Sequence, residues 1–188
     1  GQIEDPRSCD FKAASLVCKS GESPDNCLTA VQAQAAGQIY RPLLDPRTHR
    51  VISAGMPPGS ELNWDRVISR SGQAGADTEI DATSTDLSAF EARGGKIIEY
   101  QGWSNAVVSA RDTINYYESV AARQGEFART RDFYRLFLVP AMGHTGETYV
   151  FDWFGPLEEW VERGQAPEVV LARHIPPPGV TPAAPRGL

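Results

Sequence analysis

The sequence predicts an α/β fold in which a short parallel sheet is covered by helices. A strand, a loop and a helix follow one another twice between residues 96 and 164, and each helix shows apolar residues at helical spacing. A chain of 188 residues, of which 41% are hydrophobic and 22% charged, is long enough for one globular domain with a small appendage. Disorder over most of the chain is therefore excluded.

The first repeat begins after a short helix that is expected over residues 86–95 and ends at a glycine pair. Residues 96–100 form a run typical of a buried strand, and residues 102–105 are the loop at its carboxyl end. The next helix is expected to begin after Ser109, whose hydroxyl can cap it, and to end at Gly125. Its inward-facing residues are Ile114, Tyr117, Val120 and Ala121.

The second repeat consists of a strand over residues 134–139, a loop over 140–146 and a helix over 151–161 that stops at Gly164. The inward-facing residues of this helix are expected to be Phe151, Phe154, Leu157 and Val161. In a parallel sheet, ligands bind beyond the carboxyl ends of the strands. We therefore expect the loop 101–108 and the loop of this second repeat to meet at one candidate site.

The first part of the chain, up to about residue 65, is turn-rich and contains one expected helix, which begins after Asp25 and Asn26. The apolar face of this helix is Leu28, Val31, Ala35 and Ile39. Residues 44–60 lack apolar periodicity and are predicted to be an ordered loop. From His174 onward the chain is proline-rich and extended.

Three cysteines, Cys9, Cys18 and Cys27, fall among turn-forming residues near the start of the sequence. Such clustering is typical of an oxidised, extracytoplasmic region, and the odd number leaves at least one cysteine without a partner in this chain. A bridge between Cys18 and Cys27 would stabilise the fold by roughly 3 kcal/mol. Three reduced thiols in a cytosolic protein are the alternative, and a zinc site is disfavoured because no histidine lies nearby.

The charge pattern argues against two classes of partner. Lys and Arg number 18 against 24 Asp and Glu, which gives a net charge of −6, and no basic cluster stands out. No apolar run approaches the roughly 18 to 20 residues that a membrane helix needs. We expect neither nucleic acid nor a membrane as a partner.

Only three histidines are available as a general base. His144 directly follows the second strand, and Gly143 and Gly146 flank it, which lets the backbone turn tightly and present the imidazole outward. A loop histidine with only a structural hydrogen bond is the alternative. His49 and His174 are expected to be ordinary surface or packing residues.

A histidine base in a hydrolase needs a nucleophile and an orienting acid. The chain contains no Gly-x-Ser-x-Gly elbow. The loop after the first strand offers Asn105 at the place of an acid, although an amide cannot ionise. Trp103, close to it, either lines an aromatic-substrate pocket or anchors the loop by packing.

Four stretches of the chain resemble the tannase and feruloyl esterase family, which also includes enzymes that cleave mono-hydroxyethyl terephthalate. Three resemble its carboxyl-terminal half: residues 86–103 (DLSAFEARGGKIIEYQGW), 139–144 (VPAMGH) and 159–167 (EWVERGQAP). The fourth begins with DPRSCDF at residue 5, continues through Cys18 to residue 30, and resembles part of the family's lid domain. The match covers nearly the whole chain, and the order and spacing of the four stretches make it specific.

This resemblance implies a partial α/β-hydrolase core, of parallel strands with flanking helices, plus an irregular disulfide-containing lid segment. It implies a lid-like segment over 1–80, the carboxyl-terminal part of the core over 81–175 and a proline-rich tail over 176–188. The enzymes it points to are secreted or periplasmic, hydrolyse esters of aromatic acids through a Ser-His-Asp triad, and need no cofactor for catalysis.

Individual residues acquire roles from the same resemblance. His144 matches the triad histidine, and Asn105 falls where the family has the aspartate of a Gly-Trp-x-Asp motif. Cys18 and Cys27 match one bridge of the lid. The family's lid also holds a structural calcium ion, of whose ligands only the backbone carbonyl of Gln2 falls within this chain.

The chain departs from the family pattern in ways that limit its chemistry. Asn105 replaces an acid, and such a change in a serine triad lowers the rate by roughly 10⁴ through the wrong histidine tautomer. Thr145 stands where the family has a cysteine that bridges to one beside the nucleophile, and the partner expected for Cys9 lies upstream. We expect the nucleophilic serine outside this chain and the chain alone to be inactive.

Two functions follow from these observations. The first is a secreted carboxylic-ester hydrolase in which His144 is the base, acting on a small aromatic ester together with a missing amino-terminal half or a chain disulfide-linked through Cys9. The second is a non-catalytic relative that binds aromatic ligands, which Asn105 and Thr145 favour.

Overall fold

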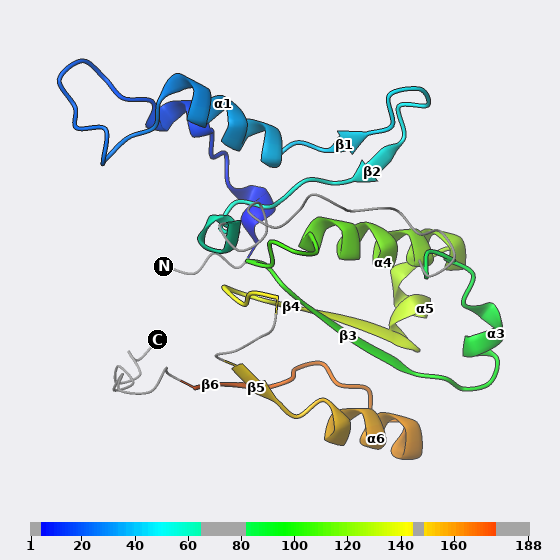
Figure 1. Cartoon of the computed structure of the whole chain (residues 1–188). Helices are drawn as coiled ribbons and strands as arrows, with labels where there is room; N and C mark the ends of the chain where they lie inside the picture. The colour runs from blue at the N-terminus through cyan, green and yellow to red at the C-terminus, as the bar shows by residue number, and fades with distance from the viewer. Residues whose placement is uncertain (1–4, 65–81, 145–148, 176–188) are drawn as a thin grey trace.

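The computed structural model describes residues 5–64, 82–144 and 149–175 (Figure 1). At its centre, strands β3 (Ile97–Gly102) and β4 (Tyr134–Val139) lie parallel and pair in register from one end to the other. The predicted strand, helix, strand order is therefore confirmed, and β3 extends two residues further than predicted. Because the register is continuous, both strands end at the same edge of the sheet.

Helix α4 (Ala110–Gln124) covers one face of this strand pair (Figure 1). The Ser109 hydroxyl accepts a hydrogen bond from the Arg111 backbone N–H at 3.2 Å, so the predicted cap is confirmed. Gly125 ends the helix with a φ of 93°, a left-handed conformation that favours glycine. The short helices α3 (Ser88–Glu91) and α5 (Phe127–Arg131) lie near the amino-terminal ends of the two strands (Figure 1).

Two buried clusters join α4 to the sheet. One is formed by Trp103, Ala110 and Ile114, and the other by Val120, Phe133 and Tyr134. The predicted inward stripe of α4 is confirmed, since Ile114, Val120 and Ala121 are buried and Tyr117 packs against the second cluster. Burial of these side chains is the main stabilising contribution to this part of the fold.

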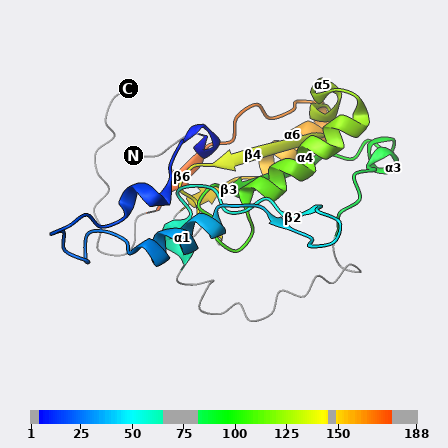
Figure 2. The same cartoon turned by 90° about the horizontal axis from the view of Figure 1, so that it is seen from above.

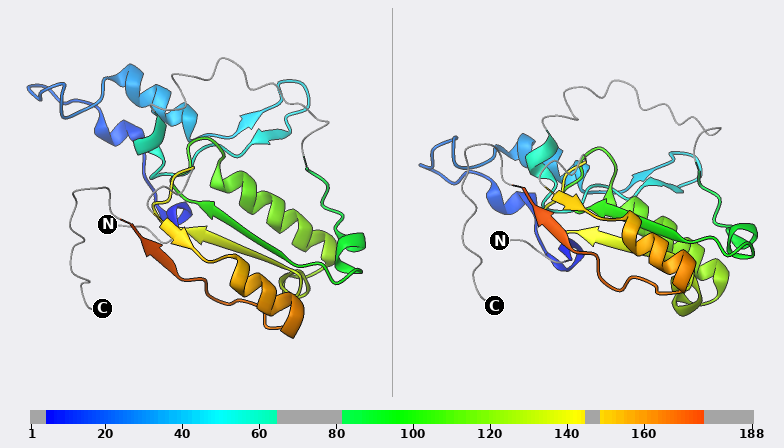
Figure 3. Two further views of the ribbon diagram at one scale, coloured as in Figure 1. Left: turned by 60° about the horizontal axis from the view of Figure 1, so that its bottom comes forward. Right: turned by 90° about the horizontal axis from the view of Figure 1, so that it is seen from below.

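The opposite face of the sheet is covered by α6 (Phe154–Arg163) and by the antiparallel pair of β5 (Tyr149–Phe151) and β6 (Ala172–His174) (Figure 3). The helix predicted over residues 151–161 was wrong in its start and in its buried face. Residues 149–151 pair with 172–174 instead, which removes Phe151 from the helix.

The buried face of α6 also differs from the predicted one. Phe154 is 75% exposed and Val161 59%, whereas Trp160 is only 2% exposed. The side chains of Lys96 and Arg135 lie over the Trp160 ring at 5.3 and 5.7 Å from its centroid. The Trp160 ring with its cationic neighbours therefore takes the buried place that the sequence assigned to Phe154 and Val161.

Most of the front segment, residues 5–64, lies on the side of α4 that faces away from the sheet, and its first residues lie near the carboxyl end of the strands (Figures 1 and 2). Its elements are η1 (Pro6–Ser8), η2 (Ala13–Leu16), α1 (Ala30–Ile39), β1 (Leu43–Leu44), β2 (Val51–Ser53) and η3 (Glu61–Asn63). Helix α1 begins at a capping box, in which the Thr29 hydroxyl accepts from the Gln32 N–H and the Gln32 side chain accepts from the Thr29 N–H. A helix is present in this region as predicted, but it begins at Ala30, so Leu28 of its expected apolar face lies outside it.

Two details of the front segment were predicted wrongly. The apolar face of α1 does not include Val31, which is 75% exposed, and Ala33 is the buried residue. Residues 44–60 are not only loop, because β1 and β2 form an antiparallel hairpin. The Asp45 carboxylate closes its turn by accepting two backbone N–H groups, a local contact that apolar periodicity does not reveal.

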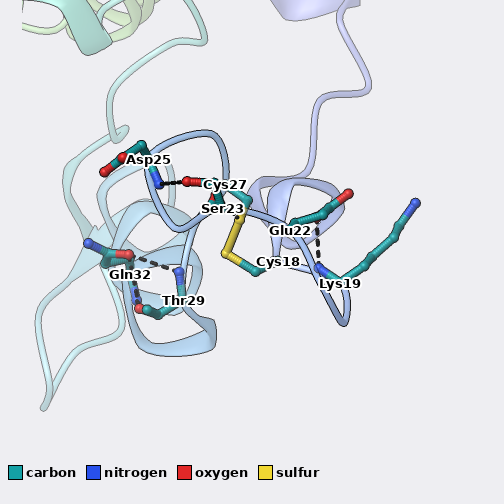
Figure 4. Close-up of a disulfide and its surroundings, with 8 residues drawn as sticks. All are labelled: Cys18, Lys19, Glu22, Ser23, Asp25, Cys27, Thr29 and Gln32. Atoms are coloured by element: carbon teal, nitrogen blue, oxygen red, sulfur yellow. Dashed lines mark hydrogen bonds between the residues drawn. A yellow bond between two sulfur atoms is a disulfide. The ribbon is translucent and has the colours of Figure 1, made fainter.

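A disulfide joins Cys18 to Cys27 and closes the loop before α1 (Figure 4). Within the loop, the Glu22 carboxylate accepts from the backbone N–H of Lys19 at 2.7 Å. Cys9, the third cysteine, is free and half-buried. The pairing implied by the family resemblance is therefore confirmed.

The first turn of α4 binds the front segment through polar contacts. The Asp112 carboxylate accepts from the Ser53 hydroxyl at 2.8 Å and from the Ala54 N–H at 2.6 Å. The Ser109 hydroxyl donates to the Gly55 carbonyl at 2.6 Å. These contacts place the β1–β2 hairpin beside the first turn of α4, which directly follows the loop of residues 102–108.

Candidate active site

The loops after β3 and β4 pack directly against each other. The Trp103 N–H donates to the Val139 carbonyl and the Ser104 N–H to the Met142 carbonyl, both at 3.0 Å. A Cβ atom at Gly102 would overlap with the Met142 carbonyl, so this close approach requires glycine. The shared edge predicted from the βαβ order is therefore present.

Asn105 lies at the base of this junction and is only 3% exposed. Its Oδ1 accepts hydrogen bonds from the backbone N–H groups of Val107 and Val108, at 2.9 and 3.0 Å. Its Nδ2 donates to Gln101 Oε1 at 3.0 Å and lies 3.3 Å from Nδ1 of His144. All polar atoms of the Asn105 side chain thus have partners.

His144 comes from the loop after β4, and its side chain is exposed. Asn105 and His144 are 39 residues apart in sequence, and the parallel pairing of β3 and β4 brings them within hydrogen-bond distance. Sequence reasoning selected both residues without showing their contact. An exposed imidazole positioned by a buried polar partner is an arrangement that can exchange protons with a bound reactant.

Gln101 is a site residue that sequence reasoning missed. It is buried at the end of β3, where its Oε1 also accepts from the Gly102 N–H at 3.0 Å. Its Nε2 donates to the Val108 carbonyl at 3.3 Å and to Thr113 Oγ1 at 3.1 Å. A polar residue at the penultimate position of β3, four residues before Asn105, was the signal in the sequence.

Trp103 does not line an open surface. It is 3% exposed and packs against Ala110 and Ile114, with Leu136 and Leu138 beside the cluster. The Arg7 guanidinium of the front segment lies 6.0 Å from the centroid of its ring. This burial favours the packing role, one of the two that the sequence left open, over the substrate-binding role predicted for Trp103.

The calcium prediction depends on the backbone carbonyl of Gln2. Gln2 and Thr145 both lie outside the described residues. Within the ranges that are described, no group of three or more His, Cys, Asp or Glu side chains is arranged to hold a metal ion. Calcium binding through the Gln2 carbonyl remains a prediction.

No helix among the described residues is long and apolar enough to cross a membrane.

Residues 65–181 match the family described as Tannase and feruloyl esterase. The chain belongs to this family. An uncharacterised esterase of Xanthomonas campestris is 33% identical over 92% of this chain and 43% of its own length. The mono(2-hydroxyethyl) terephthalate hydrolase of Piscinibacter sakaiensis is 51% identical over 48% of this chain and 15% of its own length.

Solved structures show the same fold. The crystal structure of feruloyl esterase B from Aspergillus oryzae superposes with a TM-score of 0.72 at 24% identity, over 89% of this chain and 43% of that one. The chain spans 43% of the length of the Xanthomonas esterase and of the Aspergillus structure. Its fold is therefore part of the α/β-hydrolase core of an esterase family, together with a segment that carries the Cys18–Cys27 disulfide.

Proposed function

We propose that this chain supplies the histidine and the acid-position residue of a serine esterase that cleaves esters of aromatic acids. The observation that supports it is the contact of Asn105 Nδ2 with His144 Nδ1 at the carboxyl edge of two parallel strands, in a chain of an esterase family. The nucleophilic serine is contributed by residues outside this chain, which spans 43% of the length of its Xanthomonas relative.

In this proposal, His144 accepts the proton of the serine hydroxyl as the oxygen attacks the ester carbonyl. The same ring then gives the proton to the departing alcohol oxygen, and water completes hydrolysis of the acyl-enzyme. Asn105 holds the ring from its Nδ1 side but carries no charge to stabilise the imidazolium. We therefore expect turnover to be slow, on the order of 10⁴ below that of a site with aspartate.

The substrate class is proposed from the relatives. Their names refer to feruloyl esters and to mono(2-hydroxyethyl) terephthalate, which share an aromatic acid. An oxidising compartment, outside the cell or in the periplasm, is supported by the Cys18–Cys27 disulfide. Cys9, half-buried and outside this bridge, is the proposed link to a further chain or segment.

The first measurement is the intact mass of the purified protein without and with reductant. A mass above 20.5 kDa that falls to this value on reduction supports a partner linked through Cys9. A larger mass under both conditions supports a longer polypeptide that carries the serine. A mass of 20.5 kDa under both conditions contradicts a covalently attached nucleophile.

The same preparation is then assayed with methyl ferulate and mono(2-hydroxyethyl) terephthalate. His144→Ala is expected to abolish turnover, and His49→Ala, in the exposed turn of the β1–β2 hairpin, is the matched control that should retain it. Equal turnover by the wild type and His144→Ala would contradict the proposed base. Binding of these esters without turnover would favour the ligand-binding alternative.

A further inference from the structure

We propose that Gln101 is a positioning residue that forms a matched amide pair with Asn105 and, through it, keeps His144 protonated on Nε2. The proposal deepens the proposed function. Only the effect that it predicts on turnover rests on that function. The position of the proton is a property of the folded chain and can be measured without any ester.

The orientation of the Asn105 amide follows from its neighbours. Two backbone N–H groups, from Val107 and Val108, point at the Asn105 atom that is assigned as oxygen. A flipped amide would set its NH₂ group against these two donors and its oxygen against Gln101 Oε1. Buried groups left in that arrangement would lose their hydrogen bonds, so the observed orientation is favoured.

The orientation of the Gln101 amide has independent support. The Gly102 N–H donates to one end of the amide, and the Val108 carbonyl accepts from the other. A flip would place donor against donor at Gly102 and acceptor against acceptor at Val108. Gln101 therefore presents its oxygen to Asn105, so a hydrogen-bond donor at position 105 fits this oxygen and an acceptor there would oppose it.

This arrangement determines the tautomer of His144. The Asn105 atom 3.3 Å from His144 Nδ1 is an amide nitrogen, which can donate but cannot accept. In a neutral imidazole, one ring nitrogen is a donor and the other an acceptor. With Nδ1 as the acceptor, the proton lies on Nε2, and that nitrogen cannot take the serine proton until the tautomer changes.

The pair also explains why an acid at position 105 alone would not restore the triad geometry. In Asn105→Asp, a carboxylate oxygen would face Gln101 Oε1, and a flip of Gln101 would break its contacts with Gly102 and Val108. In either case, two acceptors or two donors would face each other in the protein interior without a hydrogen bond. Replacing both residues removes this conflict.

The test is NMR of the imidazole nitrogens of ¹⁵N-labelled protein, with His144→Ala used to assign the signals. The wild type is expected to carry the His144 proton on Nε2. In Gln101→Met/Asn105→Asp, the carboxylate should accept from Nδ1–H, so the proton should move to Nδ1. Asn105→Asp alone should show a smaller fraction of the Nδ1 form than the double variant. The control Asn115→Asp, on the exposed side of α4, should leave the wild-type signal unchanged.

Two results would overturn the proposal. A wild-type proton on Nδ1 would contradict the amide orientation, and equal Nδ1 fractions in the single and double variants would contradict the role of Gln101. If the double variant does not fold, urea unfolding decides the second point: Asn105→Asp should have a lower midpoint than Asn115→Asp, and equal midpoints would contradict the conflict with Gln101.

Turnover of methyl ferulate separates this proposal from the proposed function. In a preparation that contains the serine, the double variant should exceed Asn105→Asp, with an upper bound on the order of 10⁴ over the wild type. Absence of turnover in every variant would contradict the proposed function and leave the tautomer result standing. Turnover by a wild type whose proton lies on Nδ1 would contradict the present proposal alone.

Discussion

The front segment and the unit formed by residues 82–175 are stabilised in different ways. In the latter, large side chains such as Val120, Phe133 and Trp160 are almost fully buried. In the front segment, the buried apolar residues include Ala13, Ala33 and Ala54, and larger ones such as Val31, Leu43 and Leu62 are exposed. The front segment therefore gains less from apolar burial and depends more on its disulfide and its polar contacts.

This difference matters for the candidate site because the two regions meet beside it. The polar contacts of Ser53, Ala54 and Gly55 all end on the first turn of α4, directly after the Asn105 loop. Changes in the apolar core of residues 82–175 should destabilise the whole fold. Changes at the Cys18–Cys27 bridge or at Asp112 should destabilise only the front segment. The following variants test that separation.

The largest effect is expected for Phe133→Ala, which removes a ring buried between α4 and β4. The loss of burial and the remaining cavity should lower the free energy of unfolding by about 3–5 kcal/mol, as measured by urea denaturation. Phe154→Ala, at a residue that is 75% exposed, is the matched control and should be nearly neutral. Similar losses in both variants would contradict a core centred on Phe133.

Replacing the bridge with Cys18→Ser/Cys27→Ser should lower the free energy of unfolding of the front segment by roughly 3 kcal/mol. Hydrogen exchange should increase in the front segment, at the amides of Cys18 and Leu28 that join the two sides of the bridge, and remain unchanged in α4. Cys9→Ser is the control. Faster exchange throughout β3 and β4 would show that the two regions are not stabilised separately.

Asp112→Ala removes the carboxylate that accepts from Ser53 and Ala54. Loss of hydrogen bonds to a charged group should weaken attachment of the front segment by about 2 kcal/mol. The readout is the exchange rate of the Ala54 amide, with Asp10→Ala, at an exposed residue, as the control. An unchanged Ala54 rate would contradict the role assigned to this contact.

The smallest effect on stability is expected for Glu99→Gln in β3. Burial raises the pKa of Glu99, and the hydrogen bond from the Tyr134 hydroxyl only partly opposes this rise. Because the folded pKa lies above the unfolded one, Glu99 lowers stability as pH rises through the folded value. Gln keeps an acceptor for Tyr134, so the variant should be more stable than the wild type at neutral pH and equal to it in acid; urea unfolding at both pH values checks this.

The sequence predicted the central unit well because its signals are local. The apolar runs of β3 and β4, the Ser109 cap and the Gly125 stop are each read from a few neighbouring residues. The pairing of β5 with β6 is not, because it joins residues 149–151 to a segment more than twenty positions away. With residues 149–151 in that strand pair, α6 begins only at Phe154.

The candidate site divides in the same way. The positions of Asn105 and His144 followed from the expectation that parallel strands end at one edge, and from the family resemblance. The role of Gln101 depends on which end of two amides faces which backbone group, and no residue pattern contains that information. Trp103 was selected as an aromatic residue near the site, but its burial depends on the packing of α4.

The pairing of β3 with β4 has one more consequence. Among the described residues, neither strand has another neighbour in its sheet, so each presents a row of backbone N–H and C=O groups along its outer edge. Such edges recruit further strands, either from a polypeptide that extends the sheet or from another copy of the same molecule. The isolated chain is therefore expected to self-associate through these two edges unless further strands cover them.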